Sequence, residues 1–154
     1  MQQKTKYNCL VLWLDCDQDA LDERLDGRVD KMMKDGLLEE VRALYTNYTK
    51  INLDPNVCND ENRLDYTRGV WQAIGLKEFL PYFEKYAVIT GEKAQLTEGE
   101  EQARKALLDE CVDNIKTSTR RYSRRQRKWI LKRLVGQNGI HVVRLDASDA
   151  STYP

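Results

Sequence analysis

The spacing of apolar residues changes along the chain, and each change predicts an element. Residues 7–15 (YNCLVLWLD) are nearly continuous in apolar side chains, which is typical of a strand covered on both faces in a parallel sheet. Apolar residues then recur at helical spacing at Leu21, Leu25, Val29 and Met32. Gly36 interrupts this pattern, and a new apolar face predicts a second helix that starts near Leu37.

The second half of the chain predicts one long helix and a closing strand. Residues 46–62 are polar and contain Pro55, so we expect a loop or insertion there. Residues 70–82 predict a short helix, and residues 98–134 predict a long one. The apolar positions of the long helix include Ala103, Leu107, Cys111, Ile115, Tyr122 and Trp129, and the last three recur every seven residues on one narrow face. We expect Tyr122 and Trp129 to pack inward. Residues 140–146 predict the second strand.

The order strand, helices, strand predicts an α/β fold in one domain over residues 1–154. Two strands are too few to build a sheet of their own in a domain of this size. We therefore expect them to belong to a larger parallel sheet, so that the chain is a mostly helical piece of a larger protein. A mostly helical domain with a two-stranded ribbon is the alternative.

The formal net charge is zero because an acidic segment and a basic segment of the chain offset each other. Residues 15–40 hold ten acids against four bases, whereas residues 116–133 hold nine bases and no acid. This asymmetry favours a polyanionic partner for the basic segment. The alternative is that the basic segment pairs with the acidic segment in the folded chain. Because no acid occurs between Asn114 and Arg144, we favour the polyanion.

The four cysteines form no CxxC pair, and His141 is the only histidine, so a zinc site of usual spacing is not expected. Cys9 and Cys111 are interpreted as small buried apolar side chains. No apolar run approaches the length of a membrane span. Reduced thiols then predict a cytoplasmic protein, with mitochondrial or nuclear pools as alternatives.

Arg24 and Arg28 lie four residues apart, on one face of the first helix. From the spacing alone we favour surface charge paired with Asp22 or Asp26. The alternative is a clamp for a polyphosphate, because departing negative charge must be neutralised.

The string LDERLDGRVDKMMKDGLLEEV, residues 21–41, resembles the pattern L-x-x-R-(I/L)-x-x-R-(V/I)-x-x-M-x-x-x-G-(L/F)-x-x-E-V of tRNA dimethylallyltransferases, also called tRNA isopentenyltransferases. Its matching residues are Leu21, Arg24, Leu25, Arg28, Val29, Met32, Gly36, Leu37, Glu40 and Val41. Three blocks similar to eukaryotic members follow in family order: GVWQAIGLKEFLPYF, TRRYSRRQRKWIL and HVVRLDAS. The resemblance extends from Tyr7 to about Ser148.

The resemblance implies transfer of a dimethylallyl group from dimethylallyl diphosphate to N6 of the adenosine beside the tRNA anticodon. It also implies a P-loop-NTPase-like parallel sheet and Mg²⁺ in the complete enzyme. The implied diphosphate contacts are Lys77, Arg24 and Arg28, with Lys77 standing where bacterial relatives carry an arginine. A helix-surface lysine is the alternative for Lys77. The implied contacts to the tRNA anticodon stem-loop are Gln72, Ile74, Gly75, Arg120, Arg121, Arg124, Arg125, Arg127, Lys128 and Lys132. For Tyr122 and Trp129, stacking on unpaired RNA bases is the alternative to inward packing.

Two family motifs do not occur between Met1 and Pro154: a P-loop similar to G-P-T-G-[ST]-G-K-[ST], and the Asp-Ser-x-Gln segment that carries the catalytic Asp. We therefore expect the chain to be the C-terminal portion of the enzyme. It would then hold no catalytic residue, ligate no metal and be inactive alone. The alternatives are a non-catalytic RNA-binding module and the lid part of a P-loop kinase. The pattern carries no signal for oligomeric state.

Overall fold

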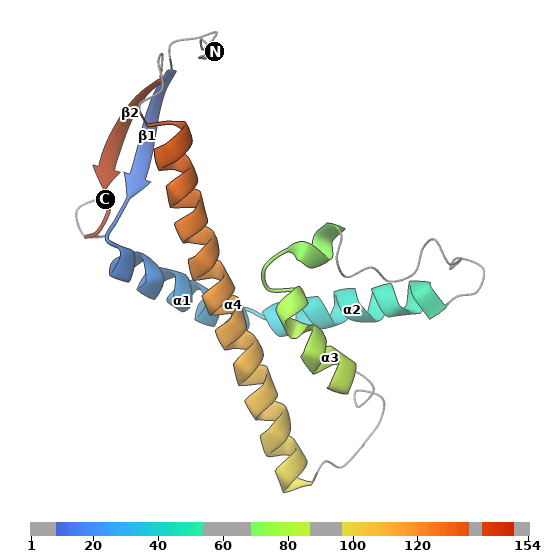
Figure 1. Ribbon diagram of the computed structural model, residues 1–154. Helices are drawn as coiled ribbons and strands as arrows, with labels where there is room; N and C mark the ends of the chain where they lie inside the picture. The colour runs from blue at the N-terminus through green and yellow to red at the C-terminus, as the bar shows by residue number, and fades with distance from the viewer. Residues whose placement is uncertain (1–8, 54–68, 87–96, 136–139, 150–154) are drawn as a thin grey trace. The chain divides into compact units, whose positions relative to one another are not determined.

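The computed structural model describes residues 9–53, 69–86, 97–135 and 140–149. In chain order its elements are β1 (Cys9–Asp15), α1 (Gln18–Lys34), α2 (Leu37–Leu53), the 3-10 helices η2 (Gly69–Gln72) and η3 (Lys77–Phe79), α3 (Leu80–Tyr86), α4 (Glu98–Arg133) and β2 (Ile140–Asp146) (Figure 1). Within the domain expected from the chain's length, contacts define two compact units. The first unit comprises residues 1–27 and 119–154, and the second comprises residues 28–118.

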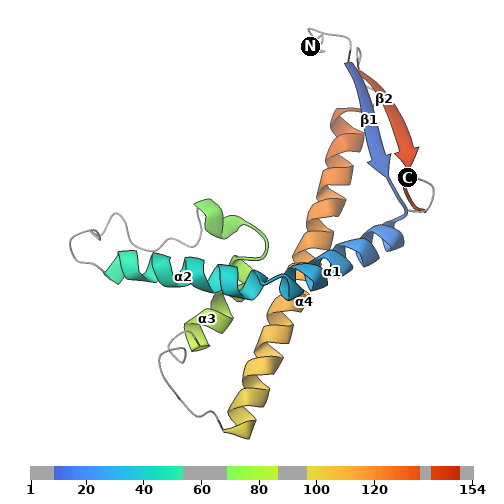
Figure 2. The same ribbon diagram turned by 180° about the vertical axis from the view of Figure 1, so that it is seen from behind.

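The first unit contains the sheet. Strands β1 and β2 pair in parallel, in a register that runs from Cys9 opposite Ile140 to Asp15 opposite Asp146 (Figure 1 and Figure 2). A hydrogen bond from the Ala147 backbone N–H to the Asp15 carbonyl oxygen, 2.7 Å, continues this pairing beyond β2. Both predicted strands and their parallel direction are confirmed.

The two faces of β1 have different surroundings. Trp13 and Val142 share one face of the sheet, where they line a hollow of about 310 Å³ with Leu131 of α4. On the opposite face Leu10, Leu12 and Leu14 are 64%, 61% and 66% exposed. Among the described residues nothing covers this second face, so the expectation of a strand covered on both faces within a larger sheet stays a prediction. An apolar run specifies a strand, but the contacts of each face depend on what packs there.

We expect that replacing Leu10, Leu12 and Leu14 by threonine will raise the solubility of the isolated chain several-fold. Contiguous exposed apolar side chains promote association, and threonine is a less apolar, β-branched residue that favours a strand. Soluble protein after centrifugation and light scattering would measure this. Val70→Thr is the control, because Val70 is also exposed, at 55%, but lies outside the sheet. A wild-type chain that is already monomeric and unfolds reversibly would contradict the prediction.

The second unit has an apolar core formed by helices and rich in aromatic rings. Its buried residues are Val29, Val41, Phe79, Tyr82, Phe83, Tyr86, Cys111 and Ile115. Phe83 stacks on Tyr45 of α2 at a centroid distance of 5.3 Å, and Tyr45 meets Trp71 edge-on at 6.4 Å. Contacts between aromatic rings thus hold η2 and α3 against α2.

Helix α2 is longer than the sequence predicts. Residues 46–53 are helical rather than part of a loop, while the remainder of the predicted insertion, 54–62, lies outside the described residues. Tyr48 contacts the Trp71 ring at 5.3 Å, and the Thr49 hydroxyl donates to the Tyr45 carbonyl oxygen at 2.8 Å. Packing of Tyr48 on Trp71 thus offsets the low helix propensity of this polar stretch, while the Thr49 hydroxyl is satisfied by the backbone of its own helix.

The single helix predicted over residues 70–82 is wrong, because the segment forms η2, η3 and the start of α3. Gly75 interrupts it with φ of 98°, a left-handed conformation that an α-helix excludes. The Gly75 backbone N–H instead donates to Glu78 Oε2 at 2.9 Å. Gly36, with φ of 103°, separates α1 from α2 as expected.

Helix α4 begins where the sequence predicts and ends one residue earlier, at Arg133. A capping box starts it: the Glu100 N–H donates to Thr97 Oγ1 at 3.3 Å, and the Thr97 N–H donates to Glu100 Oε2 at 2.8 Å. The hydrogen bonds from the Thr97 backbone and side chain lower the pKa of Glu100. Tyr122 and Trp129, expected to pack inward, are 48% and 53% exposed, so the buried apolar face of α4 ends at Ile115.

Candidate nucleic-acid interface

Eight of the nine basic side chains between Lys116 and Arg133 fall on two neighbouring faces of α4. The paired face carries, at spacings of four and three residues, Lys116, Arg120, Arg124 and Arg127. The free face, roughly 100° further around the helix, carries Arg121, Arg125, Lys128 and Lys132.

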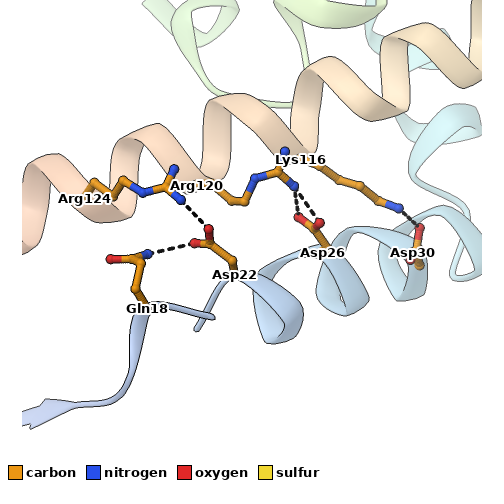
Figure 3. A network of polar contacts seen from close by, with 7 residues as sticks. All are labelled: Gln18, Asp22, Asp26, Asp30, Lys116, Arg120 and Arg124. Carbon is orange, nitrogen blue, oxygen red and sulfur yellow. Dashed lines mark hydrogen bonds and ion pairs between the residues drawn. The ribbon is translucent and has the colours of Figure 1, made fainter. Parts of the chain in front are cut away.

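Aspartates of α1 neutralise most of the paired face (Figure 3). In the first unit, Arg120 Nη1 donates to both carboxylate oxygens of Asp26 at 2.5 Å, and Arg124 pairs with Asp22. In the second unit, Lys116 Nζ lies 2.6 Å from Asp30 Oδ1. The three aspartates are four residues apart, so α1 presents them to α4 from a single face.

Asp15 pairs with both Arg127 and Arg144. It lies at the end of β1 with its side chain only 5% exposed, and its Oδ2 accepts from Arg127 Nη2 at 3.0 Å and from Arg144 Nε at 2.7 Å. The Arg144 guanidinium also lies 5.9 Å from the centre of the Trp13 ring. Asp15 was not among the predicted site residues; its signal in the sequence is a carboxylate that ends a buried-type strand.

The pairing of basic and acidic segments, which the sequence analysis treated as the weaker alternative, is therefore present for the whole paired face. The physical reason is that both helices place like charges at the same four-residue spacing, so several pairs form together. The predicted tRNA contacts at Arg120, Arg124 and Arg127 stay predictions. RNA phosphates would have to compete with aspartates for these arginines.

The free face has no such partners. Its four side chains are exposed and form no ion pair with any residue that the structure describes. Like charges one helical turn apart repel by a few tenths of a kcal/mol each, and phosphates would remove this cost. The arginine fork also suits phosphate, because it donates two hydrogen bonds at once. Charge and exposure make the free face the best anion-binding surface of the described chain.

Of the two predicted clamp arginines on α1, Arg24 has a structural role. Its Nη1 donates to the Ala147 carbonyl oxygen at 2.6 Å and its Nη2 to the Ser148 carbonyl oxygen at 2.7 Å. The expected pairing of Arg24 with Asp22 or Asp26 is wrong, since both carboxylates bind arginines of α4. Arg28 is exposed and forms no ion pair among the described residues.

The chain segment that Arg24 holds is itself hydrogen-bonded. Asp146 accepts from the Ser148 hydroxyl at 2.6 Å and from the Ser148 N–H at 2.9 Å, and these bonds lower the pKa of Asp146. The Asp17 N–H donates to Ser148 Oγ at 2.9 Å. Arg24 and Ser148 thus tie the start of α1 to the end of β2.

The remaining predicted site residues lie in the second unit. Lys77 is half exposed, with its Nζ 3.9 Å from Oε1 of the buried Glu78. Gln72 is exposed, whereas Ile74 packs against the core and Gly75 is buried. Lys77 and Gln72 are thus accessible to a ligand, and Ile74 and Gly75 shape the backbone beside them.

Two cysteines of the described chain differ in their surroundings. Burial raises the pKa of the Cys111 thiol, which keeps it protonated and unreactive. Cys9 is exposed, which corrects the expectation of a buried thiol there.

The described residues contain no group of three or more potential metal-ligating His, Cys, Asp or Glu side chains. None of the described helices is both long and apolar enough to cross a membrane.

The fold and this surface define a class: an α/β protein that exposes a cationic helix face suited to a polyanion. The family model for IPP transferase matches residues 1–133. The chain belongs to the IPP transferase family, which confirms the resemblance found in the sequence. This membership favours a transferase over the lid of a kinase.

Relatives in fungi and animals are similar over nearly the whole chain. The tRNA dimethylallyltransferase of Saccharomyces cerevisiae is 36% identical over 148 residues, which are 96% of this chain and 29% of that protein. The human tRNA dimethylallyltransferase is 38% identical over 149 residues, 95% of this chain and 28% of that protein. A crystal structure of a eukaryotic dimethylallyltransferase acting on tRNA has a TM-score of 0.64 at 36% identity, covering 92% of this chain and 28% of that one. The chain thus spans under a third of these relatives, and the likeness confirms the predicted fold class.

Proposed function

We propose that this chain is the tRNA-contacting part of a tRNA dimethylallyltransferase. The complete enzyme would transfer a dimethylallyl group from dimethylallyl diphosphate to N6 of the adenosine beside the anticodon. The adenine would have to leave its stack to reach the reagent. Cytoplasmic localisation, with mitochondrial or nuclear pools, is part of the proposal.

The observation that carries the proposal is the free face of α4. It presents four exposed cations, and the surrounding segment contains no acid. Phosphate contacts of this kind supply affinity and position an RNA without reading its sequence. We assign the main phosphate contacts to Arg121, Arg125, Lys128 and Lys132, while the paired face keeps α4 attached to α1 and β1.

Two cations are available for the diphosphate. Lys77 and Arg28 are accessible, and each can neutralise charge on a departing phosphate. Arg24 would bind the diphosphate only if it gave up its hydrogen bonds to the carbonyl oxygens of Ala147 and Ser148. Mg²⁺, which the family implies, would neutralise further charge. We assign it no ligand among the described residues.

Salt-dependent RNA binding tests the proposal. Fluorescence anisotropy of a labelled anticodon stem-loop RNA should show a steep fall of affinity with salt. Changing Arg121, Arg125, Lys128 and Lys132 together to glutamine should reduce the slope of log Kobs against log[salt] by about 3 and weaken binding on the order of a hundredfold.

The matched control removes the same charge elsewhere. Lys31, Lys34, Lys50 and Lys105 are exposed, and their change to glutamine should leave the slope within about 1 of the wild type. An equal loss of RNA affinity in both variants would mean that the lower net charge of the chain, and not the free face, weakens binding. Absence of salt-dependent binding by the wild-type chain would sink the proposal.

A further inference from the structure

Two aromatic rings lie exposed on α4 where an inward-facing stripe was expected. Tyr122 and Trp129 are 48% and 53% exposed. Together with Arg125 and Gln126 they line an open hollow of about 550 Å³ on the helix. All four residues belong to the first unit. A large exposed tryptophan marks an interaction surface more often than a lone exposed aliphatic residue does.

We propose that this aromatic hollow, formed by Tyr122, Arg125, Gln126 and Trp129, stacks unpaired bases of a single-stranded RNA loop. This inference rests on the proposed function, since it needs RNA on the free face. It goes further by naming the unpaired loop bases as the part of the RNA that the rings contact. Single-stranded loops are recognised chiefly by stacking of splayed bases on aromatic rings and arginine planes.

The position of the hollow on the helix supports RNA as its occupant. The hollow adjoins the free face, and Arg125 belongs to both. A backbone whose phosphates follow the free face would therefore direct its bases toward the rings. Seven residues correspond to about 10 Å along a helix, so Tyr122 and Trp129 offer two separate platforms rather than one sandwich.

The polar members of the hollow also fit a base better than an apolar protein surface. A packed apolar partner would bury the Arg125 charge without an acid to compensate it, because none occurs between Asn114 and Arg144. A nucleotide brings its own phosphate. The Gln126 amide both donates and accepts, so it can pair with the edge of a stacked base.

The test compares two RNAs with the same phosphates: an anticodon stem-loop and the same stem-loop with abasic loop positions. The wild-type chain should bind the intact loop about tenfold more tightly than the abasic one. The intact loop should also quench tryptophan fluorescence, and Trp129→Leu should abolish most of this quenching. Changing Tyr122 and Trp129 to leucine should remove the preference for the intact loop while leaving affinity for the abasic RNA unchanged.

Leu131→Ala serves as the control, because Leu131 is 48% exposed but lies outside the hollow. It should keep the preference for the intact loop. Equal, salt-dependent binding of both RNAs by the wild type, or loss of affinity for both RNAs in the leucine variant, would overturn this inference alone. Failure to bind either RNA would overturn the proposed function together with it.

Discussion

Replacing Phe83 by alanine is expected to lower the free energy of unfolding of the second unit by about 3–5 kcal/mol. Phe83 is 1% exposed and lies at the centre of the aromatic core. Its ring meets Tyr45 at 5.3 Å, Tyr82 at 5.6 Å and Phe79 at 6.1 Å. Alanine would remove these contacts and leave a cavity that three bulky neighbours cannot close without leaving their rotamers.

Urea unfolding followed by near-ultraviolet circular dichroism would measure this loss, since the signal reports the packed aromatic rings. Hydrogen exchange should at the same time accelerate in α3 and around Cys111. Val70→Ala is the control, because Val70 is 55% exposed and should change stability by less than about 0.5 kcal/mol. If Phe83→Ala were as mild as Val70→Ala, the core described for this unit would be wrong.

Changing Asp22 and Asp26 to asparagine is expected to raise the affinity for anticodon stem-loop RNA about tenfold. These carboxylates pair with Arg124 and Arg120, and asparagine cannot neutralise a guanidinium. The two carboxylates that compete with RNA phosphates for these arginines would then be removed. The same change should lower stability by only about 1 kcal/mol, because all four side chains are at least 21% exposed and solvent screens the pairs.

A charge-matched control separates release of the arginines from a change in net charge. Asp109 and Asp113 are exposed on α4 and form no ion pair among the described residues. Their change to asparagine adds the same charge but frees no arginine, so it should raise affinity far less. A comparable gain in RNA affinity in both variants would mean that the paired face does not contact the RNA, even after its aspartate partners are removed.

Much of this protein could be predicted from the sequence alone. Apolar periodicity located both strands and the long α4, and Gly36 marked the break between α1 and α2. The acidic and basic segments were visible as charge blocks, and the family followed from four blocks in order. These features are local: spacing along the chain is enough to determine which residues share a helix face or a strand.

The tertiary structure decided what each face contacts. Arg120 and Arg121 are adjacent and chemically identical, yet one binds an aspartate of α1 and the other forms no ion pair among the described residues. Tyr122 and Ile115 share one stripe, yet only Ile115 reaches the core. Periodicity fixes the direction of a side chain relative to its own helix, whereas its partner comes from a segment that lies far away in sequence. For that reason only the folded chain separates the cations of α4 that pair with aspartates from the cations that stay exposed.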